Sequence, residues 1–142
     1  MGTRIVGKHS GVAGLLLLCV VAMQLHAETI TVTNTNDSGP GSLPQALAIA
    51  NDGDAITFAV TGTVSLTSGG LLIAKNVTIS GPGANQLSVD SNQALFVFGV
   101  FPDKIATVSG LTVRNGQLGI WNAQGTLALI DCAISFNSSG GI

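Results

Sequence analysis

Apolar and polar residues alternate over short stretches along most of the chain from residue 28 onward. Ile30 and Val32 stand between threonines, which is the pattern of a strand that buries one face. From residue 55, runs of three to six residues rich in Val, Ile, Leu and Thr are separated by Gly, Asn, Ser and Asp, which indicates an all-β chain. The predicted strands lie within 28–35 and at 56–60, 63–66, 71–74, 77–80, 86–89, 95–100, 106–108, 111–113, 118–121, 126–130 and 132–134.

One stretch, residues 42–50, has a helical period instead. Ser42 is a suitable N-cap, Gln45 follows it by three residues as in a capping box, and Pro44 falls in the first turn, where its missing N–H costs little. A turn-forming sequence at 51–54 ends the predicted helix. The apolar face has i, i+3, i+4 and i+7 spacing: Leu43, Ala46, Leu47 and Ala50.

Internal repeats distinguish between the possible β architectures. Three pairs of segments match: 77–81 with 106–110, 108–113 with 129–134, and 118–120 with 140–142, at offsets of 29, 21 and 22. A period near 21–22 with several short strands predicts the coil of a parallel β-helix, in which Val108 stacks on Leu129 and Val113 on Ile134. The alternative is a β-sandwich, which gives this spacing no role.

The predicted helix has a function in a solenoid, because an open end exposes apolar core and unpaired strand edges. A helix laid over the first coil would cover them; the alternative is a helix packed on the side of the coils. The expected organisation is a signal peptide at 1–27, an N-terminal cap of strand plus helix at 28–54, and the first coils of a parallel β-helix at 55–142. Residues 139–142 resemble the opening of another coil, so we expect a chain truncated at its C-terminus.

Residues 1–27 have the layout of a cleaved secretory signal peptide. A basic segment precedes an apolar run at 12–23, and Ala27 supplies the small residue at the cut. The apolar run is short for a bilayer span, which needs about 20 residues. Two alternatives remain: an uncleaved N-terminal anchor, and a lipoprotein signal ending at Cys19, although Leu18 stands where a small residue is expected.

Removal of this segment changes the chemistry of the chain. Both histidines, His9 and His26, leave with it, and Cys132 is the cysteine that remains. The mature chain therefore lacks the residues for a His-dependent nucleophile, a His or thiolate zinc site, or an intrachain disulfide. Its 3 basic and 7 acidic residues give a net charge of −4. We expect no nucleic-acid partner and no membrane insertion of the mature segment.

Carbohydrate cleavage is the enzymatic chemistry left open. It generally uses two carboxylates about 5–9.5 Å apart, and the candidates are Asp90, Asp103 and Asp131. Asp131 aligns with a glycine one coil earlier, and an apolar strand separates the other two. We therefore expect exposed turn aspartates and not a catalytic pair. The cations available to a lyase, Lys104 and Arg114, are distant in sequence from any acidic cluster.

The turn at 51–54 offers oxygen ligands of the kind that Ca²⁺ prefers. Asn51, Asp52 and Asp54 supply two carboxylates and one amide, which are too few for a calcium site. The segment is better interpreted as the turn that ends the helix. We assign no catalytic, cofactor-binding or metal-binding residues to this chain and expect no cofactor.

The roles of Cys132 and Trp121 depend on whether their side chains face into or out of the solenoid. Cys132 aligns with the inward residue Leu111, so a buried apolar thiol is expected. Trp121 is expected to be an outward-facing packing aromatic, with a sugar-stacking platform as the alternative. Asn-x-Ser/Thr sequences, which matter only in a eukaryotic secretory pathway, occur at Asn36, Asn76 and Asn137.

Segments 30–34 (ITVTN), 41–47 (GSLPQAL) and 56–58 (ITF) resemble the N-terminal cap of large bacterial surface proteins with right-handed parallel β-helix repeats. Segments 108–116 and 125–129 look like the repeats of those proteins. The group overlaps with polymorphic outer membrane proteins and autotransporter passengers. The resemblance implies a right-handed coil, a secreted or cell-surface location, including the outer membrane, and often an adhesive function without a catalytic set.

The expected function is therefore that of an exported, non-enzymatic β-helix module, structural or adhesive, of a cell-surface or secreted protein. Its expected partners are a surface polysaccharide or a ligand on a host or neighbouring cell. The alternative is the N-terminal part of a β-helical polysaccharide lyase or glycoside hydrolase whose active site lies in downstream coils.

Overall fold

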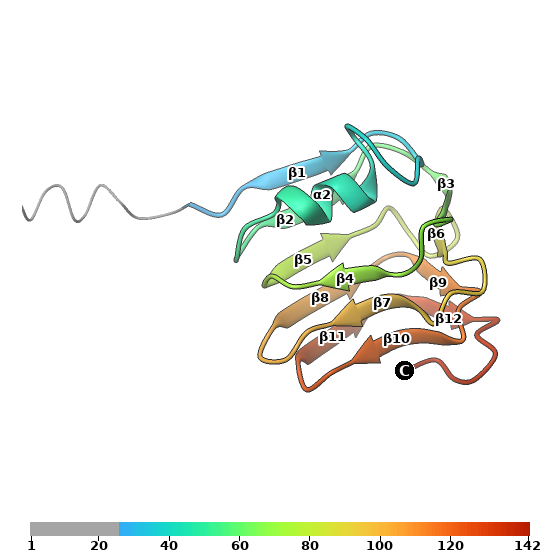
Figure 1. Cartoon of the computed structure of the whole chain (residues 1–142). Helices are drawn as coiled ribbons and strands as arrows, with labels where there is room; N and C mark the ends of the chain where they lie inside the picture. Colours follow the sequence, from blue (N-terminus) through green and yellow to red (C-terminus); the bar gives the residue numbers. More distant parts are fainter. Residues whose placement is uncertain (1–25) are drawn as a thin grey trace, which may run out of the picture.

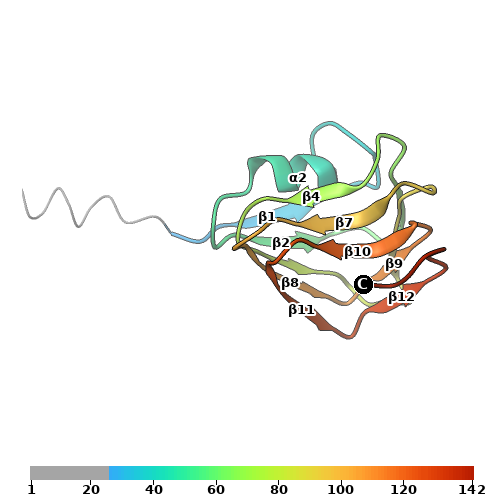
Figure 2. The same ribbon diagram turned by 60° about the horizontal axis from the view of Figure 1, so that its bottom comes forward.

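The computed structural model describes residues 26–142, which form a right-handed β-solenoid of about four turns (Figures 1 and 2). Each full turn supplies one strand to each of three sheets, and Figure 2 shows these sheets around a common interior. Strands of successive turns pair in parallel throughout the described region. The predicted parallel β-helix is confirmed, and the β-sandwich alternative is wrong because a sandwich is built from antiparallel strands.

The three sheets, here named A, B and C, follow one another around each turn. Sheet A contains β1 (Thr29–Val32), β2 (Ala55–Phe58), β5 (Val77–Ser80), β8 (Ile105–Ser109) and β11 (Thr126–Ile130). Sheet B contains β3 (Gly62–Ser65), β6 (Leu87–Asp90), β9 (Thr112–Arg114) and β12 (Ala133–Ser135). Sheet C contains β4 (Leu71–Ile73), β7 (Phe96–Val100) and β10 (Leu118–Asn122).

The core consists of inward-facing apolar columns. Residues i and i+2 of a strand face the same side, so each strand contributes alternate residues to the interior. In sheet A one column runs through all five strands in register: Ile30, Ile56, Ile79, Val108 and Leu129. Its three middle members are fully buried. Each turn therefore stabilises its neighbours, as expected for a solenoid.

The register agrees with all three predicted repeats. Val77 pairs with Ala106, Val108 with Leu129, and a bridge joins Leu118 to Gly140. The turns differ in length between 29 residues from β5 to β8 and 21 residues from β8 to β11. The corner loops take up the difference, so the strands stay in register.

The helix α2 (Leu43–Ile49) lies at the N-terminal end of the stack, next to β1 and β4 (Figure 1). It begins after Ser42, whose Oγ accepts the N–H of Gln45 at 3.2 Å as the predicted N-cap. Leu43, Ala46 and Ala50 of its predicted apolar face are buried and join the core. The helix stands where a sheet C strand would lie in later turns, so it covers the first turn.

Most of the predicted signal peptide, residues 1–25, lies outside the described residues. The uncleaved-anchor and lipoprotein alternatives concern the same segment. Among residues 26–142, no helix combines the length and apolar character needed to cross a bilayer.

Candidate functional site

Sheet C carries an apolar outer surface. Leu72 of β4 and Trp121 of β10 face outward on either side of Gly99 in the register, and they are 49% and 44% exposed. The ring of Phe96 stacks on Trp121 with 5.7 Å between ring centroids and 26° between ring planes. We name Leu72, Phe96 and Trp121 the aromatic face. The predicted outward orientation of Trp121 is confirmed, and its ring packs on that of Phe96.

Two glycines allow the Phe96 ring to lie on the sheet. A Cβ on Gly99 would meet Phe96 Cε2 at 3.0 Å and Leu72 Cδ2 at 3.1 Å. A Cβ on Gly70 would collide first with the backbone carbonyl oxygen of Phe96 and would also meet the ring, at 2.6 Å from Cδ2. A side chain at either position would displace the Phe96 ring, so both glycines are needed for the ring to lie against the backbone of the sheet.

A groove of about 360 Å³ lies between α2 and β4. Pro44 and Leu47 line it from the helix, and Leu72 and Lys75 line it from the β4 side. Leu72 belongs to both features, so the groove and the aromatic face form one continuous surface along sheet C. Contiguous exposed apolar surfaces are the features that interaction sites use, so we take this surface as the candidate site.

Sequence reasoning identified Trp121 but missed Phe96, Leu72 and the groove. The signal was present in the runs 71–74 and 95–100, which are apolar at almost every position. Because alternate residues of a strand face opposite sides, part of such a run must point outward.

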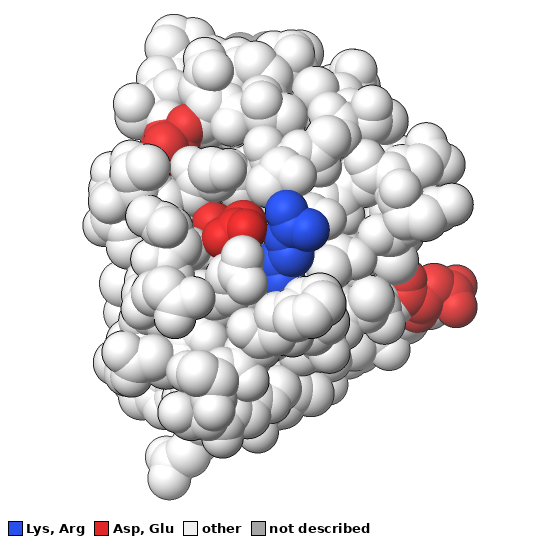
Figure 3. Space-filling model, turned by 90° about the vertical axis from the view of Figure 1, so that its right-hand side faces the viewer, with Lys and Arg blue, Asp and Glu red and all other residues white. Residues whose placement is uncertain are grey.

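Sheet B has a polar outer surface that contains an ion pair. Arg114 Nε lies 3.2 Å from Asp90 Oδ2, which also accepts a hydrogen bond from Asn115 Nδ2 at 2.7 Å. Figure 3 shows a basic group in contact with an acidic one in a largely uncharged surface. Arg114 is distant from Asp90 in sequence, but the stacking of β9 directly on β6 brings the two side chains together.

The three candidate carboxylates lie at three different corners of the solenoid. Asp90 ends β6 between sheets B and C, Asp103 precedes β8 between C and A, and Asp131 follows β11 between A and B. Asp103 and Asp131 are exposed and have φ values of 62° and 51°, as residues in tight turns do. The structure therefore does not bring these carboxylates together, and the expected turn positions of Asp103 and Asp131 are confirmed.

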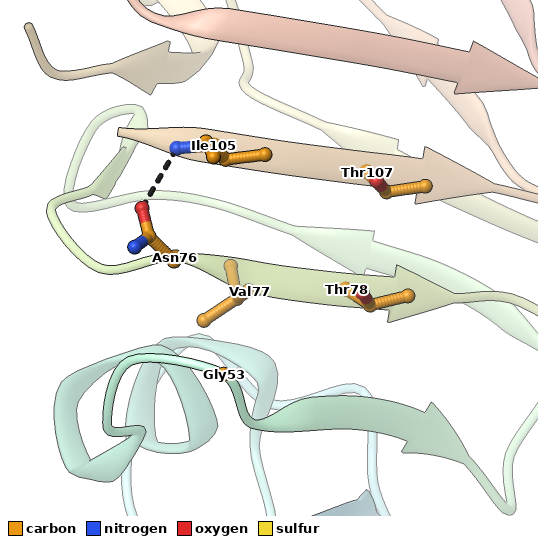
Figure 4. Close-up of a pocket in the computed structure, with 6 residues that line it drawn as sticks. All are labelled: Gly53, Asn76, Val77, Thr78, Ile105 and Thr107. Carbon is orange, nitrogen blue, oxygen red and sulfur yellow. Dashed lines mark hydrogen bonds between the residues drawn. The ribbon is translucent and has the colours of Figure 1, made fainter. Parts of the chain in front are cut away.

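A hollow of about 150 Å³ opens beside sheet A, between the turns that precede β5 and β8 (Figure 4). Its central amide is committed to the fold, since Asn76 Oδ1 accepts the N–H of Ile105 at 2.8 Å. Asp52 accepts the N–H of Asn76 at 2.8 Å and pairs with Lys104 at 3.9 Å. These polar contacts join successive turns of the solenoid at the edge of the hollow.

The segment 51–54 forms the predicted helix-ending turn. Asp54 is only 2% exposed, and its carboxylate accepts the N–H of Asn51 at 2.8 Å and that of Glu28 at 2.9 Å. These two bonds, first that of Asn51, lower the pKa of Asp54 below its ordinary value. Within the described region, no group of three or more His, Cys, Asp or Glu residues could hold a metal ion.

Cys132 occupies the position predicted from its alignment with Leu111, because β12 continues in register on β9. It packs against the core but is only partly buried. Its turn is the last one described, so it has a neighbouring turn on one side. Two asparagines of the glycosylation sequences join adjacent turns. Asn76 Oδ1 accepts the N–H of Ile105, and Asn137 Oδ1 accepts the N–H of Gly116.

Comparison of the chain with protein families, with curated proteins and with solved structures finds no match.

Proposed function

We propose that this chain is an exported, non-enzymatic β-solenoid module of a secreted or cell-surface protein, and that it adheres to surface polysaccharide through the aromatic face. The observation that carries the proposal is the Phe96–Trp121 stack on sheet C, in which Trp121 is 44% exposed. The segments that resemble bacterial right-handed β-helix surface proteins, including the autotransporter-passenger group, support the same assignment.

The properties of the surface favour a neutral polysaccharide over other ligands. Exposed aromatic rings offer apolar planes against which the C–H faces of pyranose rings can lie. Lys75 is the charged residue that lines the groove, so the surface has little to attract a strongly charged polymer. The groove and the aromatic face continue one another through Leu72, which suits a linear chain.

The arrangement of charged groups supports a binding role over a catalytic one. Asp90 is already bonded by Arg114 and Asn115, and the two other candidate carboxylates stand at different corners. A carbohydrate-cleaving enzyme with its active residues in further coils is the second candidate. The Asp90–Arg114 pair on the outer face of sheet B is the observation in its favour.

Binding can be tested with a matched pair of variants. Leu72 and Ile130 are both aliphatic, and they are 49% and 51% exposed on sheets C and A respectively. The assay is affinity electrophoresis, in which binding to a soluble neutral polysaccharide in the gel slows the protein. We expect Trp121→Ala to lower the affinity obtained from this retention by roughly threefold to tenfold. Leu72→Ala should weaken it less, and Ile130→Ala should leave it unchanged.

Several outcomes would contradict the proposal. Equal retention of Trp121→Ala and the wild type would show that the aromatic face does not bind polysaccharide. Self-association that disappears in Trp121→Ala would assign this face to a second copy of the chain. Release of new reducing ends or unsaturated sugars by the wild type would favour the enzyme.

Export is tested separately by expressing the full gene product and separating the cell fractions. Export predicts the protein in the medium or on the cell surface, with a shortened N-terminus. Fusion of residues 1–27 to a reporter that folds outside the cytoplasm should export the reporter. Retention of both proteins inside the cell would overturn this part of the proposal.

A further inference from the structure

The carboxylate of Asp54 accepts a hydrogen bond from the backbone N–H of Glu28. Asp54 Oδ1 accepts this N–H at 2.9 Å, and Asp54 Oδ2 accepts the N–H of Asn51 at 2.8 Å. Asp54 is 2% exposed, although no cationic side chain pairs with it among the described residues. A buried carboxylate that accepts only neutral donors is an unusual arrangement, because burial of a charge is costly without a counter-charge.

The position of Glu28 is fixed from its other side as well. Its carbonyl oxygen accepts the N–H of Ala55 at 2.8 Å, which starts the pairing of β1 with β2. By contrast, His26, Ala27 and Glu28 are exposed at the surface. The residues on both sides of the Ala27–Glu28 peptide bond are therefore exposed, while the nitrogen of this bond, that of Glu28, is already held against the fold.

We propose that the Ala27–Glu28 bond is a processing site, and that the amino group freed by the cut docks on the Asp54 carboxylate and locks the N-terminal cap. The inference rests on the proposed function only in requiring a protease of the export pathway that removes residues 1–27. Hydrolysis consumes one water. The Ala27–Glu28 C–N bond breaks, the OH of water goes to the Ala27 acyl carbon and its hydrogen to the Glu28 nitrogen. The amine then takes a proton from solvent.

Cleavage changes the nature of the Asp54 contact without moving its atoms. In the precursor the donor is a neutral amide N–H. In the processed chain the donor is an ammonium group, so the bond becomes charge-assisted and roughly twice as strong. The Asp54 carboxylate also gains the counter-charge that it lacks in the precursor. Processing therefore strengthens the contact between the start of β1 and the helix-ending turn.

The pair gives a characteristic pH dependence. A free α-amino group has a pKa of about 7.7–8.0, and pairing with Asp54 raises it in the folded state. The stabilisation is thus fully present below about pH 8 and is lost as pH rises through the raised pKa. The ionisable groups around the pair are the Glu28 side chain, Asp52 in the same turn, Lys104 paired with Asp52, and Lys75 beside Asn76.

The test compares two forms of the processed chain. One form begins at Glu28 and the other retains Ala27, so both carry one α-ammonium group but only the first places it at Asp54. We expect the Glu28 form to have a roughly fivefold to tenfold larger folding equilibrium constant at pH 7 in urea unfolding. The difference should vanish above about pH 10 and in Asp54→Asn. It should persist in the matched control Asp52→Asn.

Equal stability of the two forms, or a difference that persists in Asp54→Asn, would overturn the docking. If Asp54→Asn fails to fold, the pH profile of α-amine acetylation decides instead, because docking requires a pKa above that of the unfolded chain. N-terminal sequencing of the exported protein tests the cut: a start at a residue other than 28 overturns the processing site while export itself stands. The polysaccharide assay is independent of each of these outcomes.

Discussion

The inward column of sheet A offers a direct test of how this solenoid is held together. Ile79 is fully buried at the middle of that column, between Ile56 of the preceding turn and Val108 of the following turn. Replacing Ile79 by alanine removes three buried carbons, which is worth about 2.5 kcal/mol in transfer free energy at about 0.8 kcal/mol each. The cavity left between two turns raises the expected loss in the free energy of unfolding to about 3–4 kcal/mol.

Urea unfolding followed by circular dichroism measures this loss. With an m-value of about 2 kcal/mol/M, the midpoint should fall by about 1.5–2 M. Ile130→Ala is the matched control, because Ile130 is 51% exposed on the outside of the same sheet, and its midpoint should change by an equivalent of about 0.5 kcal/mol or less. Leu129→Ala should fall between the two, since Leu129 has a packed turn on one side. An Ile79→Ala midpoint no lower than that of Ile130→Ala would refute the stacked-column account.

Three further predictions concern the cap and the contacts between turns. Ser42→Ala should lower the free energy of unfolding by about 1 kcal/mol through loss of the N-cap, as measured by urea unfolding, whereas Ser42→Asp should largely restore it. Hydrogen bonds from the hydroxyl of Thr67 first, and then from Ser68 and two backbone N–H groups, lower the pKa of Asp37; its contribution to stability should therefore be lost as pH falls below about 4, and thermal unfolding of Asp37→Asn should show a weaker dependence on acid pH. A Cβ on Gly81 would lie 2.9 Å from the carbonyl carbon of Gly110 in the next turn, so Gly81→Ala should cost about 1–3 kcal/mol, and an unchanged urea midpoint would contradict this contact.

The aromatic face shows where reasoning from sequence stopped. Trp121 was predicted to face outward from its place one residue after the strand residue Ile120. Its partner Phe96 could not be found in this way, since their contact depends on which residue of β7 lies beside β10. The repeat segments did not cover β7, so the register of sheet C was not available from them.

The contacts of the charged side chains also depend on the register between successive turns. Arg114 and Asp90 are 24 residues apart, and Glu28 and Asp54 are 26 residues apart. The lengths of individual turns range between 21 and 29 residues, so a fixed period of 21–22 predicts the wrong neighbour for most polar side chains in the early turns. Only the folded chain specifies how much of each turn is taken up by its corners.

Local sequence patterns were enough to predict the short strands, the helical stretch with its Ser42 cap, and the parallel β-helix implied by the repeats in the last turns. These features depend on local periodicity and on neighbours a few residues away, which a chain displays before it folds. Three features could be found only in the folded chain. They are the continuous apolar surface on sheet C, the Asp90–Arg114 ion pair, and the hydrogen bond from the Glu28 N–H to Asp54. Each of these requires side chains from different turns to meet, and the distance between turns along the chain is set by corner loops that no local pattern fixes.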